Sequence, residues 1–317
     1  ILACIKRLLR ETLPDSDSVK SIEVLETLER FMQREGIRDH FLHSFQVFLL
    51  GCIILDYHYG KFSAWYSNCF GGSSSVKIED TWLLASLLHD AKYPFQNISK
   101  WSGLGPGTGY AIKLETPRRR AQLLGSLFQH SRRMKTKNTW HSDLVDRLRN
   151  PDIEKIAIAQ VSPSSPNLPN HAAISSFSLL AKESILPPVI FCQEICPAAL
   201  AIFLHDSAVW SDMTKAGNLL PLEMKQFPLA FLLIYCDGLQ EWGRRSGNDP
   251  QGKNSCLLDL KIDEKSVTTR IWFNDPANAI MMEVQHARIL NEIVVPSEID
   301  FKCEVNITSP VATKPIR

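Results

Sequence analysis

Four stretches of the sequence place histidine or aspartate among apolar residues, where a polar side chain is costly to bury unless it is paired or binds a metal. These stretches are RDHFLHSFQV, TWLLASLLHD, AALAIFLHDS and PLAFLLIYCDG. Any one of them alone is better explained by a hydrogen-bonded core residue or a helix cap. Together they supply imidazole nitrogens and carboxylate oxygens, which are ligands for divalent first-row metals. The residue types therefore predict chemistry that depends on a metal ion.

No other catalytic motif in the sequence competes with this interpretation. There is no GxSxG nucleophile elbow, no complete P-loop and no GxGxxG ahead of a helix. The glycine-rich residues 101–110 lack the GK[ST] ending of a phosphate loop, and no strand is expected before them. Cys192 and Cys196 have no second close pair with which to complete a zinc site.

The order of the polar residues, a histidine, then a His-Asp pair, then a distant aspartate, resembles the HD-domain superfamily of metal-dependent phosphohydrolases over residues 20–245. In that family the first histidine lies four positions before an apolar residue on a long helix. His43 followed by Val47 fits this spacing, whereas His40 followed by Ser44 does not. The resemblance therefore implies His43 as the first metal ligand, with His40 as a neighbour one turn away.

The same resemblance implies further metal ligands, either in one group for one ion or in two groups for two ions. They are His89, Asp90 and Asp237 at the first ion, and His171 and His205 at a second ion. In two-metal members of the family an aspartate in the place of Asp90 bridges the ions, so the number of ions depends on His171 and His205.

Two neighbouring residues have open roles. His130 is a further candidate ligand, although its flanking arginines favour a helix end in solvent. Asp206 is either an acceptor for backbone N–H groups or a partner of a ligating histidine.

Hydrolysis of a phosphomonoester or phosphodiester is the activity that the resemblance implies, with a nucleotide as the expected small phosphorylated substrate. The ion, Mn²⁺, Fe²⁺, Ni²⁺, Zn²⁺ or Mg²⁺, would lower the pKa of a bound water from about 16 toward 7 and neutralise charge on a phosphoryl oxygen. Asp90 is expected to position this nucleophile.

Lys92 is the second catalytic candidate, as a contact for a substrate phosphate. Many catalytic members of the family carry a lysine three residues beyond the His-Asp pair, whereas Lys92 stands two residues beyond it. Arg244 and Arg245 are candidates for the same phosphate contact.

Two alternatives of other classes use the same residues. The first is a di-iron oxygenase, because some proteins with this ligand set cleave C–C or C–P bonds with O₂, and it requires an intact second site at His171 and His205. The second is a non-enzymatic regulatory protein that binds a nucleotide or a partner.

Apolar residues recur at spacings of three and four through most of the chain, which predicts a mainly α protein with a helical domain over residues 1–250. The resemblance implies that this domain is HD-like. Several expected helices begin at or near a proline, as helices often do, and Pro94 is expected to end the helix that carries His89 and Asp90. The expected helices cover residues 18–36, 40–55, 81–90, 118–130, 151–160, 171–182, 197–210 and 228–243.

The last part of the chain has a different pattern. LLDLKID, VTTRIWF and FKCEVNIT are rich in alternating and β-branched residues, and an amphipathic segment over residues 276–293 separates the second from the third. This order predicts a small α+β unit over residues 251–317, strand, strand, helix, strand. Such a unit would serve as a regulatory module or as an assembly surface for a homo-oligomer.

Composition sets the remaining expectations. The chain has 44% hydrophobic and 22% charged residues, as ordinary globular proteins do, and its net charge of +1 gives no strong signal for nucleic acid. The longest apolar runs fall well short of the roughly 20 residues of a membrane helix, so no membrane span is expected. The eight cysteines lie mostly in apolar stretches, which is typical of a reduced, cytoplasmic protein.

Overall fold

The computed structural model describes residues 40–70, 78–91, 170–180, 194–215, 221–239 and 256–307. Several sequence-based expectations fall outside these residues: Lys92, His130, Arg244, Arg245, and the helices over residues 18–36, 118–130 and 151–160.

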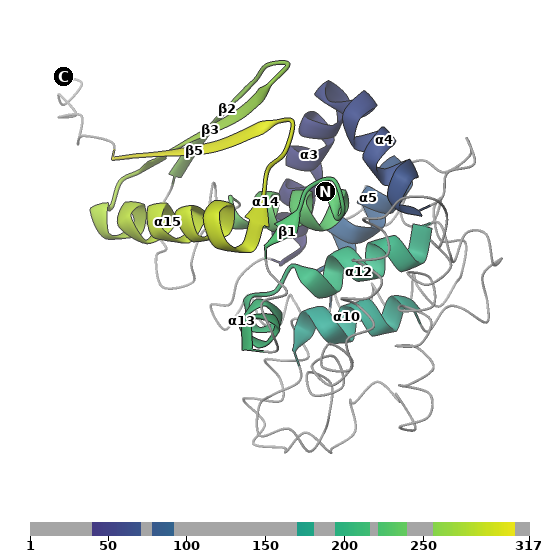
Figure 1. Ribbon diagram of the computed structural model, residues 1–317. Coiled ribbons are helices and arrows are strands. Elements are labelled where there is room, and N and C mark those ends of the chain that lie inside the picture. The colour runs from purple at the N-terminus through teal and green to yellow at the C-terminus, as the bar shows by residue number, and fades with distance from the viewer. Residues whose placement is uncertain are drawn as a thin grey trace, which may run out of the picture.

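Most of the described residues are helical, as the sequence predicts. Within the described ranges, seven α-helices precede the C-terminal sheet: α3 (His40–Tyr57), α4 (Tyr59–Phe70), α5 (Ile78–Leu88), α10 (His171–Leu180), α12 (Cys196–Leu204), α13 (Ser207–Lys215) and α14 (Pro228–Gly238). They lie together on one side of the molecule in Figure 1, with the sheet beside them. None of the helices in the described ranges is both long and apolar enough to cross a membrane.

Helix α14 lies at the centre of this arrangement. From Pro228 to Cys236 every side chain is buried, and the helix contacts α3, α4, α5 and α12. A helix that is apolar on all sides has to be surrounded by protein, which explains its central place. Pro228 opens the helix at a position where the missing N–H group has no intrahelical partner to lose.

Helices α3 and α5 approach each other closely at Gly51. The indole ring of Trp82 fills the space that a Cβ atom on Gly51 would occupy, and its Nε1 donates a hydrogen bond to the carbonyl of Phe48 at 3.1 Å. This contact fixes the position of α3 relative to α5. It therefore sets the distance between the histidines carried at the ends of these two helices.

The structure corrects one expected helix and adds another. Residues 197–210 form two helices, because α12 ends at Leu204 and Asp206 caps α13 by accepting a hydrogen bond from the backbone N–H of Ala208 at 2.7 Å. Helix α4 was not expected, although its buried residues Phe62, Trp65, Tyr66 and Cys69 follow helical spacing.

The C-terminal residues form a three-stranded sheet with one covering helix, in the predicted order. The elements are β2 (Cys256–Ile262), β3 (Ser266–Phe273), α15 (Pro276–Arg288) and β5 (Asp300–Ile307). Strand β3 is central, antiparallel to β2 and parallel to β5, so α15 is the crossover that a parallel pair requires. Figure 1 shows α15 running along one face of the sheet.

Two short elements between α15 and β5 were not predicted. A π-helical turn, η2 (Ile289–Ile293), continues α15, and β4 (Val294–Val295) then pairs with β1 (Leu222–Glu223) in parallel. This ladder ties the C-terminal unit to the segment that leads into α14. The hydrophobic core is continuous across both parts, and the domain boundary near residue 250 stays a prediction, since residues 240–255 lie outside the described ranges.

Candidate metal centre

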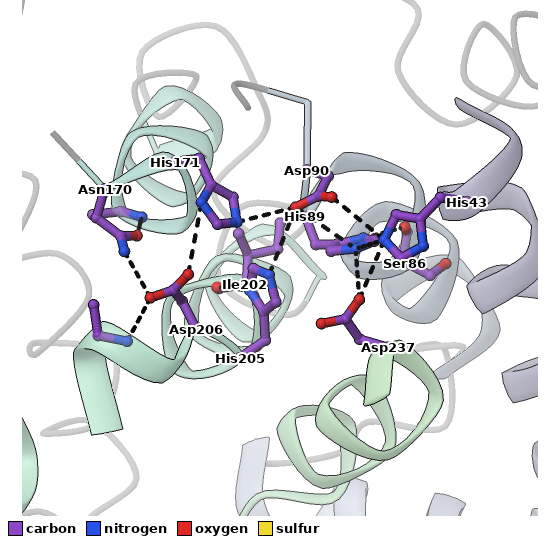
Figure 2. Close-up of polar contacts among 12 residues, drawn as sticks. His43, Ser86, His89, Asp90, Asn170, His171, Ile202, His205, Asp206 and Asp237 are labelled. Carbon is purple, nitrogen blue, oxygen red and sulfur yellow. Dashed lines mark hydrogen bonds and ion pairs between the residues drawn. The ribbon is translucent and has the colours of Figure 1, made fainter. Parts of the chain in front are cut away.

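All six residues expected to bind metal lie in one cluster where the ends of five helices meet (Figure 2). Each is placed at a helix end: His43 in the first turn of α3, His89 and Asp90 after α5, His171 at the start of α10, His205 after α12, and Asp237 in the last turn of α14. Apolar helices that end at one place bring their terminal polar residues together. His89, Asp90, His205 and Asp237 follow apolar runs, whereas His43 and His171 precede them.

Hydrogen bonds to the backbone orient two of the imidazole rings. The Nδ1 atom of His89 lies 2.7 Å from the carbonyl oxygen of Ser86, and Nδ1 of His205 lies 2.5 Å from that of Ile202. Carbonyls in the last turn of a helix lack an intrahelical partner, so they accept these bonds. We therefore assign the proton to Nδ1 in both rings, which leaves Nε2 free to take up a metal ion or a further proton.

His43, His89 and Asp237 form the first candidate group of ligands. The two Nε2 atoms lie 3.0 Å apart, and Oδ1 of Asp237 lies 3.2 Å from Nε2 of His43 and 3.6 Å from Nε2 of His89. Ligands that bind one ion at roughly 2.1 Å and at right angles to one another are about 3 Å apart. These three side chains therefore have the spacing that one metal ion requires.

Asp90 lies beside this group and belongs to a second candidate group, together with His89 and His205. Its Oδ2 is 3.3 Å from Nε2 of His43, whereas its Oδ1 is 3.0 Å from Nε2 of His171 and 3.9 Å from Nε2 of His205. Figure 2 shows the carboxylate between His171 on one side and His43 on the other. The two oxygens of Asp90 thus face two groups of imidazoles, as a bridging ligand would.

Asp206 accepts a backbone N–H, the first of the two roles that the sequence left open, and it also lies near the candidate ligand His171. Its Oδ1 accepts hydrogen bonds from Ala208 N and from Nδ2 of Asn170, each at 2.7 Å, and its Oδ2 lies 3.6 Å from Nδ1 of His171. Sequence reasoning missed Asn170. Its Oδ1 also accepts from Ala173 N at 3.1 Å, so it caps α10, and an asparagine directly before a helix is the signal that could have identified it.

The cluster is deeply buried, and Asp237 is its most exposed member. His89 is fully buried and His205 is 4% exposed, whereas the side chain of Asp237 keeps 28% of its surface exposed. Asp237 is therefore the most exposed of the six side chains.

Burial and charge act against each other on the pKa values of these residues. Burial raises the pKa of Asp237, but hydrogen bonding with His43 and His89 outweighs it and holds the pKa well below its usual range. Burial lowers the pKa of His205, but Asp90 and Asp237 raise it to about 9. Burial lowers the pKa of His89.

Charge between carboxylates and imidazoles explains two of these directions. It raises the pKa of His205 and lowers that of Asp237, whereas burial prevails at His89, so a positive charge on the neighbouring imidazoles stabilises the carboxylate of Asp237. A divalent cation would supply the same positive charge, and the donor set of imidazole nitrogens and carboxylate oxygens suits one. The residues therefore fit a metal ion.

The chain gives no match to any protein-family model, to any curated protein or to any solved structure. The interpretation of the site therefore depends on the geometry and chemistry of its own residues. What the structure shows is a buried set of histidines and aspartates that could hold a metal ion.

Proposed function

We propose that this protein is a metal-dependent phosphohydrolase that acts on a phosphomonoester or phosphodiester, with a nucleotide as the expected substrate. The observation that carries the proposal is the convergence of His43, His89 and Asp237 on one point, with Asp90 beside them. The order of these residues along the chain, which resembles the HD-domain superfamily, supports phosphoryl chemistry over other uses of a metal.

The ligand set favours a first-row transition metal. Four imidazoles, of His43, His89, His171 and His205, stand beside the carboxylates of Asp90 and Asp237 in the cluster. Imidazole nitrogens suit Mn²⁺, Fe²⁺, Ni²⁺ and Zn²⁺, whereas Mg²⁺ prefers a shell of oxygens. Such an ion, when bound, lowers the pKa of a water molecule and neutralises charge that develops on a phosphoryl oxygen.

We expect a water molecule, and not a side chain of the cluster, to act as the nucleophile. Imidazoles and carboxylates make up the cluster, and the neighbouring Ser86 turns its hydroxyl away, donating to the carbonyl of Trp82 at 2.6 Å. Asp90 has an acceptor oxygen on each side of the cluster, so it can hold and orient a water molecule. Asp237 is the most exposed residue of the cluster, so we expect the substrate to approach from its side.

An assay with a panel of nucleotides tests the proposal. Purified protein with added Mn²⁺ is incubated with nucleoside mono-, di- and triphosphates and cyclic nucleotides, and the release of phosphate and nucleoside is measured. We expect turnover of at least one class by the wild type, and none by the His89→Ala, Asp90→Ala double variant. The control is Asp212→Asn on α13, because it also removes a carboxylate but one that pairs with Lys215 at 3.3 Å. Equal activity of the double variant and the control would contradict the proposal.

A di-iron oxygenase is the second candidate, and the position of Asp90 favours it. A carboxylate with one oxygen toward His43 and the other toward His171 can bridge two ions, which this chemistry requires. Iron content after anaerobic purification and O₂ consumption by the iron-loaded protein distinguish the candidates. Iron-dependent O₂ uptake without phosphate release would favour the oxygenase.

A further inference from the structure

The last turn of α14, which carries Asp237, is held by the C-terminal unit on both sides of this ligand. The hydroxyl of Tyr235 lies 2.6 Å from Oγ1 of Thr269 on β3 and donates to the carbonyl of Lys302 on β5 at 3.2 Å. The carbonyl of Gly238 accepts a hydrogen bond from Nε2 of His286 on α15 at 3.0 Å.

The Tyr235 contact has a defined direction of bonding. Because the Lys302 carbonyl can only accept, the Tyr235 hydroxyl donates its one proton there and accepts from the Thr269 hydroxyl. Tyr235 and Thr269 are both fully buried, so neither can exchange its partner for water. A buried polar contact of this kind permits only one position of the helix against the sheet.

Because of the geometry of the helix, the Tyr235 contact also determines the direction of the Asp237 side chain. Residues two positions apart on an α-helix point about 200° apart around its axis. Tyr235 therefore reaches the sheet on one side of α14 while Asp237 points to the metal cluster on the other side. Holding the tyrosine fixes the rotation of the helix and hence the direction of the carboxylate.

The Gly238 contact fixes the end of the same turn. The approach is close, because a Cβ atom at Gly238 would lie 2.8 Å from Cδ1 of Ile289, at the end of a flexible side chain, and 3.6 Å from Cε1 of His286. The carbonyl of Gly238 is at a helix end, where it lacks an intrahelical donor, and His286 supplies one. Within the described residues Nδ1 of His286 is buried without a partner, so the bond to Gly238 is the polar contact that this ring makes.

We propose that the C-terminal α+β unit sets the position of Asp237 and thereby the metal affinity of the cluster, with Tyr235 and His286 as its positioning residues. This inference rests on the proposed metal centre. It assigns the unit a role in the site: a change in how the sheet and α15 pack against α14 alters how tightly the ion is held.

Metal affinity, measured on the full chain, tests the inference. The Tyr235→Phe, Thr269→Val double variant removes both hydroxyls and keeps the packing volume, and the dissociation constant for Mn²⁺ is obtained by competition with a chelator. The absorption spectrum of the Co²⁺-loaded protein reports the ligand geometry independently. We expect affinity to fall about tenfold, as changes to residues that orient metal ligands commonly cause, and the Co²⁺ spectrum to change.

A matched control is available in the helical part. Tyr66 and Thr81 form a buried hydroxyl pair at 2.8 Å between α4 and α5, so Tyr66→Phe, Thr81→Val removes the same groups away from Asp237. We expect this control to lower thermal stability by a similar amount and to leave the Mn²⁺ affinity and the Co²⁺ spectrum unchanged.

His286 provides a second, independent variant. His286→Leu removes the donor to Gly238 and should weaken Mn²⁺ binding, whereas His286→Gln keeps an N–H donor and should restore it. Wild-type affinity in both the Tyr235 double variant and His286→Leu, or equal losses in the Tyr66 control, would overturn the positioning role alone. A wild-type protein that binds no metal would overturn the metal centre and this inference together.

Discussion

The Nε2 atoms of His43 and His89 lie 3.0 Å apart, although the two residues are 46 positions apart in the sequence. Two imidazole nitrogens at this distance, each with a carboxylate oxygen of Asp237 close by, need a proton or a cation between them. The packing of α3 against α5 brings them together, and the end of α14 adds the carboxylate. This relationship is the basis for the predictions that follow.

Removal of metal should destabilise the protein. An ion that binds only the folded state stabilises it by about 2.7 kcal/mol at a free concentration one hundred times its dissociation constant. Thermal unfolding followed by circular dichroism should therefore show a midpoint several degrees higher with Mn²⁺ than with EDTA. The Asp237→Asn variant should lose this difference, and an equal midpoint for the wild type in both buffers would contradict the prediction.

The two oxygens of Asp90, one toward His43 and the other toward His171 and His205, predict a second ion that depends on His205. His205→Ala should retain the ion held by His43, His89 and Asp237 and lose the other. Metal content measured by mass spectrometry after dialysis should therefore fall from two ions per chain to one. If His205→Ala has the same metal content as the wild type, His205 does not bind an ion.

His286 should make the fold sensitive to acid. Burial lowers its pKa from 6.5 to about 4, although the bond to Gly238 opposes this. The unfolded chain therefore binds a proton at a higher pH than the folded protein does, so the stability contributed by the neutral ring is present above pH 6.5 and is lost as the pH falls toward 4.

Urea unfolding at several pH values measures this effect. Between neutral pH and about pH 5 the wild type should lose about 2 kcal/mol more unfolding free energy than His286→Gln, which cannot take up the proton. Parallel pH profiles for the two proteins would show that His286 does not titrate in this way.

Two glycine-to-alanine substitutions should change the stability of the protein in opposite directions. In Gly51→Ala the new methyl group meets the Trp82 ring, and overpacking costs about 1–3 kcal/mol, which exceeds the gain of about 1 kcal/mol in helix propensity. Gly60→Ala on α4 meets nothing within 4 Å, so it should stabilise the protein by about 0.4–1 kcal/mol. Chemical denaturation measures both, and a stabilised Gly51→Ala protein would show that α3 and α5 can separate without loss.

The sequence predicts the candidate ligands better than it predicts the contacts that hold these residues in place. Apolar runs that end in His or Asp are local patterns that mark His89, Asp90 and Asp237 as candidates, whereas His43 begins its helix and was implied by the resemblance to the HD-domain superfamily. The break at Asp206 was missed because a single capping residue interrupts a continuous apolar pattern over α12 and α13.

Contacts between distant segments have no local pattern. The bonds from Tyr235 to Thr269 and from His286 to Gly238 join residues 34 and 48 positions apart, and they depend on how the sheet is oriented against α14. The two-residue ladder of β1 and β4 is too short to give an alternating signal. Only the fold could supply these links.

Anomalous diffraction from crystals soaked in Mn²⁺ tests the metal centre most directly. We predict a peak at about 2.0–2.2 Å from Nε2 of His43, Nε2 of His89 and Oδ1 of Asp237, and the loss of this peak in Asp237→Asn crystals. A map with no peak between these three side chains, in crystals whose wild-type chains retain the fold described above, would contradict the account.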